Sequence, residues 1–226
     1  MASKLRLKKK SKKRENNIPN LNYENRAKAM GYKRIAGIDE VGRGPLAGPV
    51  VAACVVLKKS NFTVRVDDSK KLTPASREKA YFQIIEKAYV GVGLMSEDIV
   101  ERRNINNATV LAMRQAFFNI PVKPDIVLID GKIDLKVPVK QIAIIRGDSK
   151  SLSIAAASIV AKVLRDRLMV FYDDIFPEYG FAFHKGYGTS AHFTLLKKYG
   201  LSPLHRKNFI PANFRDLGKY EAKANN

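Results

Sequence analysis

The chain has 226 residues, of which 46% are hydrophobic, enough for one folded domain around a single core. Its formal net charge of +20 predicts a polyanionic partner, either a nucleic acid or an acidic membrane surface. No apolar stretch is long enough to cross a bilayer and no secretory signal follows the basic N-terminus, which argues against a membrane-spanning or secreted protein. We therefore expect a soluble, cytoplasmic protein.

The first segment is strongly basic. Residues 1–17 hold eight Lys or Arg residues against Glu15 alone, and so account for +7 of the net charge of +20. Such a composition cannot form a core, so we expect a disordered basic arm that is either a solvated tail or a phosphate-binding segment. The folded domain is expected over residues 18–226.

The folded part begins with strands. The pattern of apolar residues predicts strands over 34–38, 49–57 and 63–66, then a helix that starts near Pro74, and a strand over 89–95. A helix over 108–119, strands over 126–129 and 139–145, and a long helix over about 151–171 follow. Cys54 lies in an apolar run and is expected to be a small core residue. Strands that later alternate with helices indicate an α/β mixed sheet with a parallel portion, flanked by helices.

Acidic residues follow two of these strands. Asp39 and Glu40 come directly after an apolar run, and Asp130 follows another. Consecutive strand residues point to opposite faces, so Asp39 and Glu40 can reach one ion only if the strand ends there and twists. If the two strands are parallel neighbours, their acids share one edge of the sheet, where open α/β sheets bind ligands.

These carboxylates predict a metal site. Oxygen ligands favour Mg²⁺ or Mn²⁺, and with three histidines and one cysteine the chain offers little for zinc. Each acid alone could equally be a turn residue or a helix cap. The same two interpretations apply to Asp148, which either caps the helix near residue 151 or adds a metal ligand.

The chain resembles bacterial ribonuclease HII from about Arg34 to Phe209. The resemblance rests on several segments in the order of that family: Gly-Ile-Asp-Glu-Val-Gly-Arg-Gly-Pro-Leu-Ala-Gly-Pro-Val from residue 37, Asp-Ser-Lys-Lys-Leu from 68, Asn104-Ile105 with Ala108-Thr109, Ile129-Asp130-Gly131, Gly147-Asp148 with Ile154 to Lys162, and His184-Lys185-Gly186-Tyr187-Gly188-Thr189. Ribonuclease HIII is less similar, because its corresponding loop usually lacks arginine between the glycines and its chain carries a larger N-terminal domain.

The resemblance implies a ribonuclease H-like fold with a helical C-terminal extension, about 180–226, that binds substrate. It implies an endoribonuclease that hydrolyses the RNA strand of RNA–DNA hybrids and cuts 5′ of ribonucleotides embedded in duplex DNA. Metal-assisted attack of water would leave 3′-hydroxyl and 5′-phosphate ends. The acids that match the family's catalytic and Mg²⁺- or Mn²⁺-binding set are Asp39, Glu40, Asp130 and Asp148. A monomer is expected.

The resemblance also implies substrate contacts. Gly42, Arg43 and Gly44 would touch the ribose 2′-hydroxyl through backbone groups, which a bulkier side chain would block. Tyr187 would stack on the sugar that follows the ribonucleotide. Phosphate contacts are expected from basic residues, namely Arg43, Lys70, Lys185 and Arg206, with Lys71 as a further candidate.

Two other functions fit part of the pattern. A non-catalytic basic nucleic-acid-binding protein would explain the charge and the arm, but not acids at two strand ends. A metal nuclease of the same fold that acts on DNA junctions would explain the acids, but not the glycine-arginine loop. None of the three histidines is expected to bind metal.

Overall fold

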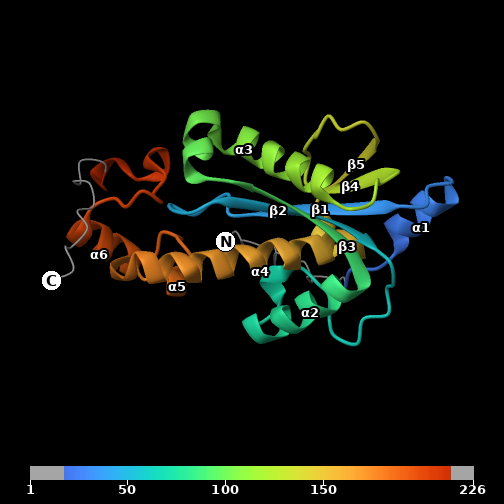
Figure 1. The fold of residues 1–226 in the computed structure, drawn as a ribbon, viewed down its shortest axis with the longest axis horizontal. Coiled ribbons are helices and arrows are strands. Elements are labelled where there is room, and N and C mark those ends of the chain that lie inside the picture. The colour runs from blue at the N-terminus through green and yellow to red at the C-terminus, as the bar shows by residue number, and fades with distance from the viewer. Residues whose placement is uncertain (1–17, 215–226) are drawn as a thin grey trace, which may run out of the picture.

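The computed structural model describes residues 18–214, so the predicted basic arm at 1–17 lies outside the described residues. Figure 1 shows a central sheet with helices on both faces. In chain order the main elements are α1 (Asn22–Ala29), β1 (Ile35–Val41), β2 (Val50–Leu57), α2 (Pro74–Lys87), β3 (Ala88–Met95), α3 (Glu97–Asn119), β4 (Ile126–Asp130), β5 (Lys140–Ile144), α4 (Leu152–Ile175), α5 (Phe181–His184) and α6 (Ser190–Tyr199).

The five strands form one sheet in the order β3-β2-β1-β4-β5. The β1–β2 and β2–β3 pairs are antiparallel, whereas β1–β4 and β4–β5 are parallel. Antiparallel neighbours can be joined by a short loop, but each parallel pair needs a crossover, and α3 supplies one between the antiparallel and parallel halves. The predicted mixed sheet with a parallel portion is confirmed.

Helix α3 covers one face of the sheet, and α4 with α2 covers the other (Figure 1). Helix α4 packs closely against β1. A Cβ atom built on Gly37 would lie only 2.2 Å from the backbone carbonyl carbon of Ser153. Only glycine allows this contact. The residues of α4 on this side are mostly small, as the sequence predicts, and they join one of the two cores that sandwich the sheet. Cys54 is fully buried in the other core.

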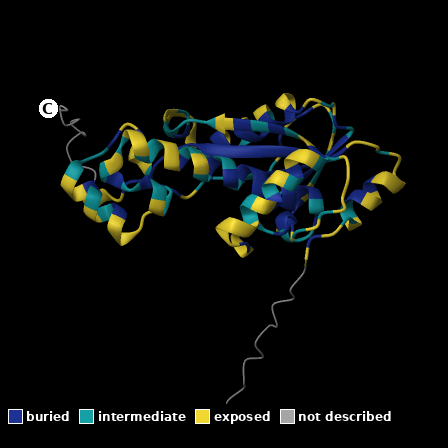
Figure 2. Ribbon diagram, turned by 60° about the horizontal axis from the view of Figure 1, so that its bottom comes forward, coloured by how far each residue is buried: buried dark blue, intermediate teal, exposed yellow. Residues whose placement is uncertain are grey.

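The C-terminal extension packs on the far half of α4. Tyr179, Phe181 and Leu196 bury their side chains against Met169 of that helix. Leu46, from the loop between β1 and β2, belongs to the same cluster. Figure 2 shows buried residues running from the sheet into this extension. The predicted helical extension is therefore confirmed, and it is packed against the loop that follows β1.

The predicted strand at 63–66 is wrong. These residues form no strand, since β3 already occupies the free edge of β2. The backbone N–H of Thr63 donates to the side chain of Gln83, and Arg65 pairs with the buried Asp67. The β-branched residues that suggested a strand are held by side-chain contacts in an irregular connection.

The predicted helix at 108–119 is only the second half of α3. The helix begins at Glu97 after Ser96, whose hydroxyl accepts the N–H of Ile99. It is interrupted at Asn104, where φ is 62°. The short polar helix α1 was not predicted, because eight residues with few apolar side chains give a weak periodic signal.

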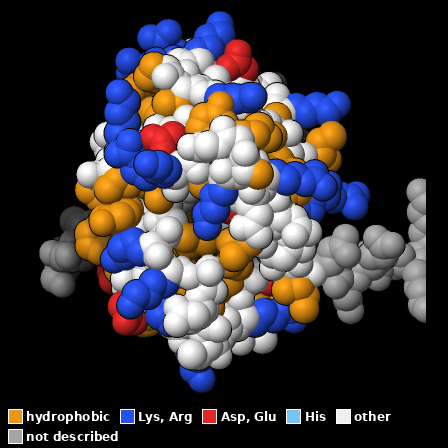
Figure 3. Space-filling view, turned by 90° about the vertical axis from the view of Figure 1, so that its right-hand side faces the viewer, with side chains coloured by type: hydrophobic (Ala, Val, Ile, Leu, Met, Phe, Trp, Pro, Cys, Tyr) orange, Lys and Arg blue, Asp and Glu red, His pale blue; other side chains and the backbone are white. Residues whose placement is uncertain are grey.

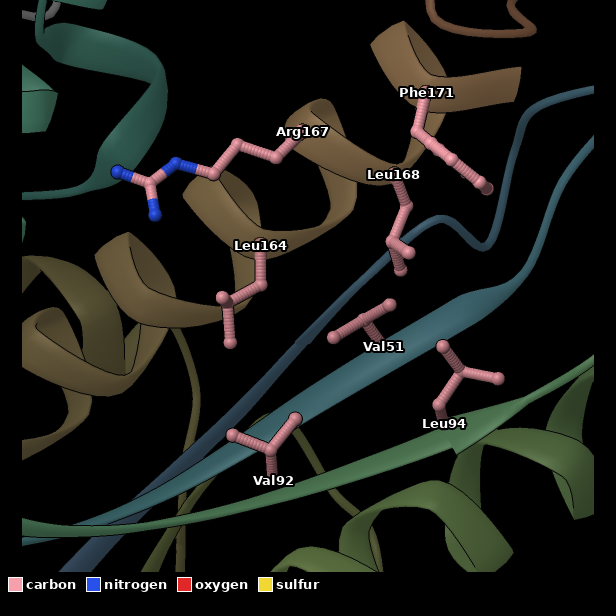
Figure 4. Close-up of a pocket in the computed structure, with 7 residues that line it drawn as sticks. All are labelled: Val51, Val92, Leu94, Leu164, Arg167, Leu168 and Phe171. Carbon is pink, nitrogen blue, oxygen red and sulfur yellow. The ribbon is translucent and has the colours of Figure 1, made fainter. Parts of the chain in front are cut away.

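The surface is basic well beyond any one site. Figure 3 faces the end of the molecule that carries α1 and shows many lysine and arginine side chains with few acidic ones. An apolar hollow of about 410 Å³ lies between α4 and the antiparallel strands β2 and β3 (Figure 4), and its lining includes none of the predicted site residues. Within residues 18–214, none of the helices is both long and apolar enough to cross a membrane.

Candidate active site

Two aspartates meet at one edge of the sheet. Ile38 of β1 lies opposite Ile129 of the parallel strand β4, so the next residues, Asp39 and Asp130, are neighbours. Both point to the face covered by α4, because side chains alternate along a strand and Gly37 faces that helix. The predicted meeting of these two acids at a shared edge agrees with the structure.

The strand does not end at the acids as expected. β1 continues to Val41 and stays paired with β2, while β4 stops at Asp130. Beyond that point β1 has no neighbour on its β4 side. Glu40 therefore has no strand beside it on that side; its side chain is 14% exposed, and its carboxylate interacts electrostatically with Asp130. The ending of the neighbouring strand, not of β1 itself, gives the two consecutive acids access to one region.

Asp148 reaches the same region from the other side of β4. It lies in a short 3-10 turn (Gly147–Ser149) between β5 and α4, and Gly147 donates its N–H to Oδ1 of Asp130 over 2.6 Å. The alternative that Asp148 caps α4 is wrong, because the hydroxyl of Ser151 accepts the capping N–H from Ile154.

Burial and mutual repulsion disfavour charge on these acids. Burial raises the pKa of Asp39 well above its usual range, and Glu40 and Asp130 raise it further. Burial likewise raises the pKa of Glu40, although Arg43 opposes this effect. The pKa of Asp148 is raised by burial and by Asp68 and Asp130. The cluster thus has more negative charge than its surroundings neutralise.

Lys70 is the basic residue that responds to all of this charge. Burial lowers its pKa, but the carboxylates of Asp68, Asp39, Asp148 and Asp130 outweigh burial and raise it. The predicted site residue Lys70 is therefore beside the acids. Asp68 was not predicted as part of the site, although it opens the Asp-Ser-Lys-Lys segment that carried the resemblance.

The donor set fits a hard divalent cation. The four carboxylates and the Ser158 hydroxyl offer oxygen ligands only. A hydrogen bond from Ser158 partly offsets the rise in the pKa of Asp39. In residues 18–214, no three such side chains are yet close enough to hold one ion. Because the carboxylates repel one another, convergence on a common point requires a positive charge there.

The loop after β1 contains two glycines with different roles. Gly42 has φ +95°, and a Cβ atom there would lie 2.5 Å from both Nε of Arg165 and the carbonyl oxygen of Pro49. A Cβ atom on Gly44 would meet nothing within 4 Å. The fold therefore requires glycine at position 42, whereas at position 44 the free protein has room for a larger residue.

Two buried arginines hold this loop. Arg165 donates to the carbonyls of Pro49, Ala47 and Lys185 over 2.9, 3.0 and 2.9 Å. Arg206, with none of its surface exposed, donates to the carbonyls of Gly48, Pro45 and Arg43. The expected phosphate contact from Arg206 is therefore wrong, because its buried guanidinium donates its hydrogen bonds to backbone carbonyls. Arg165 was not predicted, although it closely follows the Ile154 to Lys162 segment that carried the resemblance.

The remaining predicted contacts lie around this loop. Arg43 pairs with Glu40 at 3.7 Å and donates to Oδ1 of Asn106 over 2.8 Å. The ammonium group of Lys185 donates a hydrogen bond to the carbonyl of Ala182, and this bond holds the lysine side chain near the loop. Tyr187 is 40% exposed, and its ring centroid lies 5.8 Å from Cζ of Arg165. Lys71 is paired with the buried Asp67 and is less available for phosphate than expected.

The sequence model of the family described as Ribonuclease HII matches residues 36–212. The chain belongs to the ribonuclease HII family. It is therefore an enzyme of the ribonuclease H type, an endoribonuclease, and the alternative of a non-catalytic binder is not favoured. The predicted ribonuclease HII resemblance is confirmed.

Relatives agree along most of the chain. The ribonuclease HII of Geobacter sulfurreducens is 52% identical over 188 residues, covering 83% of this chain and 87% of the relative. That of Acetivibrio thermocellus is 53% identical over 194 residues, covering 83% and 75%. Among solved structures, ribonuclease H2 from Pyrococcus horikoshii gives a TM-score of 0.67 at 29% identity, covering 78% of this chain and 93% of that one. The PCNA:RNase HII complex from Archaeoglobus fulgidus gives 0.68 at 25%, covering 81% and 98%.

This ribonuclease HII also gathers its three histidines, which sequence analysis did not connect. His184, His192 and His205 form one cluster in the C-terminal extension. Burial lowers the pKa of all three, to about 4 for His192 and about 3 for His205. Each therefore stays uncharged at neutral pH. His184 lies in α5, His192 in α6 and His205 beyond α6, so no single periodic segment predicted the cluster.

The buried histidines predict a loss of stability in acid. The pKa of His192 is 6.5 when unfolded and about 4 when folded, so the unfolded chain binds more protons as the pH falls below 6.5. The stability is complete above pH 6.5 and is lost as the pH falls towards 4, by about 3 kcal/mol for this residue. Urea unfolding of metal-free protein between pH 7.5 and 4.5 measures it. His192→Phe should flatten this dependence, and an equal dependence in both proteins would contradict the assignment.

Proposed function

We propose that this ribonuclease HII hydrolyses the RNA strand of RNA–DNA hybrids and cuts 5′ of ribonucleotides embedded in duplex DNA. The observation that carries the proposal is the adjacency of Asp39 and Asp130 on parallel strands, directly before a loop whose Gly44 is open to solvent. The acids supply a site for phosphodiester chemistry, and the loop supplies backbone groups that can approach a ribose closely.

We assign the catalytic and metal-binding roles to the four carboxylates at this edge of the sheet, whose charges act on one another: Asp39, Glu40, Asp130 and Asp148. Ribonuclease H enzymes depend on a divalent cation, and we propose Mg²⁺ or Mn²⁺ here. When bound, the cations would supply positive charge to the attacking and leaving oxygens, and the products would carry 3′-hydroxyl and 5′-phosphate ends. Lys70, beside the acids, would pair with a phosphate at the cleavage site.

Recognition of the ribonucleotide is assigned to the surrounding loop. Backbone groups of Gly42, Arg43 and Gly44 would read the 2′-hydroxyl, since Gly44 has no neighbour that fills the space above it. The guanidinium of Arg43 is oriented by Asn106, and with Lys185 it would contact phosphates. Tyr187 presents an exposed ring for stacking on the sugar that follows the ribonucleotide.

Tyr187 provides a graded test of this recognition. Tyr187→Phe keeps the ring and should reduce cleavage by only a few-fold, whereas Tyr187→Ala loses the stacking surface and should reduce kcat by about 100-fold. Both should leave folding unchanged, because the side chain is half exposed. Single-turnover cleavage of a duplex with one ribonucleotide measures both. If the two variants cleave like the parent, Tyr187 is a packing residue.

The overall organisation completes the proposal. We assign residues 18–226 to the catalytic domain and its extension, about 180–226, to substrate binding, because that extension supplies Lys185 and Tyr187. The excess of positive charge suits duplexes that carry ribonucleotides. We further propose a cytoplasmic enzyme that acts as a monomer.

Mapping the cleavage position on three labelled duplexes tests the proposed function. We expect a cut 5′ of a single embedded ribonucleotide, cuts throughout the RNA strand of a hybrid, and no cut in an all-DNA duplex, each with Mg²⁺ or Mn²⁺ added. Cleavage of a DNA junction without ribonucleotides would favour the alternative junction nuclease instead. Binding without cleavage under all these conditions would contradict the assignment of the carboxylates.

A further inference from the structure

The histidine cluster is directly attached to the loop that carries Tyr187. The rings of His184 and His192 stack with centroids 4.0 Å apart and planes 14° apart. Nε2 of His192 lies 3.0 Å from Nε2 of His205, and both residues are buried, with 0% and 3% of their surface exposed. Aromatic rings of Tyr179 and Phe181 pack around them. Each ring nitrogen lies within 3.1 Å of a hydrogen-bond partner in the protein, so each proton can be assigned a position.

The hydrogen-bond partners determine where each proton lies. A backbone N–H can only donate, and that of Ser202 donates to Nδ1 of His205 over 2.9 Å. The proton of neutral His205 is therefore on Nε2, which donates to Nε2 of His192. His192 must then carry its own proton on Nδ1, which lies 2.9 Å from the carbonyl oxygen of Tyr187 and donates to it. The same oxygen also accepts the backbone N–H of Thr189 over 2.8 Å. The chain of hydrogen bonds has one direction only, from Ser202 to Tyr187.

His184 holds the same loop by independent bonds. Its Nδ1 accepts the N–H of Gly186 over 3.1 Å, so its proton is on Nε2, which donates to the carbonyl of Tyr179 over 2.7 Å. Its own carbonyl accepts the N–H of Tyr187 over 2.9 Å. The carbonyl of Gly186 in turn accepts the N–H of Leu46, from the loop after β1. The backbone around Tyr187 is thereby tied both to the histidines and to the proposed ribose-reading loop.

We propose that His192, oriented by His205, is a positioning residue for Tyr187: its Nδ1–H is the side-chain donor that, with the backbone N–H of Thr189, fixes the Tyr187 carbonyl and so sets where the exposed ring meets the substrate. The inference rests on the stacking role assigned to Tyr187 under the proposed function. Neither histidine touches the substrate. Their effect on cleavage passes through one backbone carbonyl, so it must disappear when the Tyr187 ring is absent.

The tautomers can be measured in the unaltered protein. Two-bond ¹H–¹⁵N correlation spectra of the full chain at pH 7.5 distinguish imidazoles protonated at Nδ1 from those protonated at Nε2. We expect Nδ1–H for His192 and Nε2–H for His184 and His205. Finding His192 in the Nε2–H form, or charged, overturns the proposal without any substitution.

Two substitutions of His192 then separate positioning from packing. His192→Phe retains an aromatic ring but no donor, and should lower kcat on the single-ribonucleotide duplex by about 10- to 100-fold with a smaller change in KM. His192→Asn places an amide N–H near the position of Nδ1 and should restore most of kcat. Both are assayed below their measured unfolding temperatures. Equal losses in the two variants would mean that volume, not the donor, matters, and would overturn the proposal.

The double variant His192→Phe with Tyr187→Ala gives the deciding comparison. Its kcat should match that of Tyr187→Ala alone, because the donor then has no ring to position. Multiplicative losses would show that His192 acts elsewhere and would overturn the inference. If Tyr187→Ala by itself cleaves like the parent, the stacking role under the proposed function has failed and this inference falls with it. If Tyr187→Ala is defective but His192→Phe is not, only the positioning role is rejected.

Discussion

Asp39→Asn or Asp130→Asn should reduce hybrid cleavage by at least about 1,000-fold, the effect of losing several kcal/mol of charge stabilisation at the reacting phosphate. The fold should remain intact. The side-chain oxygen of each residue accepts a backbone N–H, from Glu40 and from Gly147, and an asparagine oxygen can accept the same bond. Thermal stability without metal should rise for Asp39→Asn, because burial and its acidic neighbours already disfavour charge at that position.

Three measurements check this expectation. Single-turnover cleavage with Mg²⁺ or Mn²⁺ reports activity, thermal unfolding without metal reports stability, and fluorescence anisotropy with a hybrid reports binding. Asp174→Asn, at an exposed position in the last turn of α4, is the matched control and should behave like the parent. Near-normal turnover of either site variant with metal present would reject the carboxylate assignment.

Gly44→Ala should reduce cleavage of the single-ribonucleotide duplex by about 100-fold while leaving the free protein unchanged. No atom lies within 4 Å of the added methyl group in the protein, so an obstruction can come only from the bound substrate. Gly42→Ala is the informative comparison, because its positive φ and its 2.5 Å contacts predict a lower unfolding temperature as well.

The Gly44 test therefore separates recognition from stability. Unfolding temperatures and single-turnover rates would be measured for both variants, with the all-DNA duplex as the negative substrate. If Gly44→Ala keeps the parental rate on the ribonucleotide duplex, close backbone approach at this residue plays no part in recognition. If the all-DNA duplex is cut as readily as the ribonucleotide duplex, the loop does not read the 2′-hydroxyl at all.

Local sequence patterns predicted the parts of the structure that depend on local rules. Strand alternation and a parallel pairing were enough to place Asp39 beside Asp130, and small residues predicted the close packing of α4. The position of Glu40 relative to the other acids could not be predicted, because it depends on where the neighbouring strand β4 ends. The failed strand at 63–66 has the same cause: pairing partners are chosen by the whole sheet.

The residues that sequence analysis missed depend on long-range burial. An arginine in a basic segment looks like a surface cation, and nothing near Arg206 in the sequence reveals that backbone carbonyls surround it. Asn104 likewise gives no local sign that it interrupts a helix. The histidines are 8 and 13 residues apart, and only the tertiary fold of the extension brings their rings into contact.

The hydrogen bonds from Arg206 to the loop after β1 also have a consequence for the order of folding. Its partner Gly48 lies 158 residues earlier in the chain. We expect a contact of such sequence separation to form late in folding, since closing the long loop costs chain entropy before the contact contributes any stabilisation. Until then the carbonyls of Gly48 and Pro45 lack the donors that shape the loop. During synthesis the sheet and its acids can therefore form first, while a nascent chain that has not yet released Arg206 lacks the finished loop to which we assign ribose recognition.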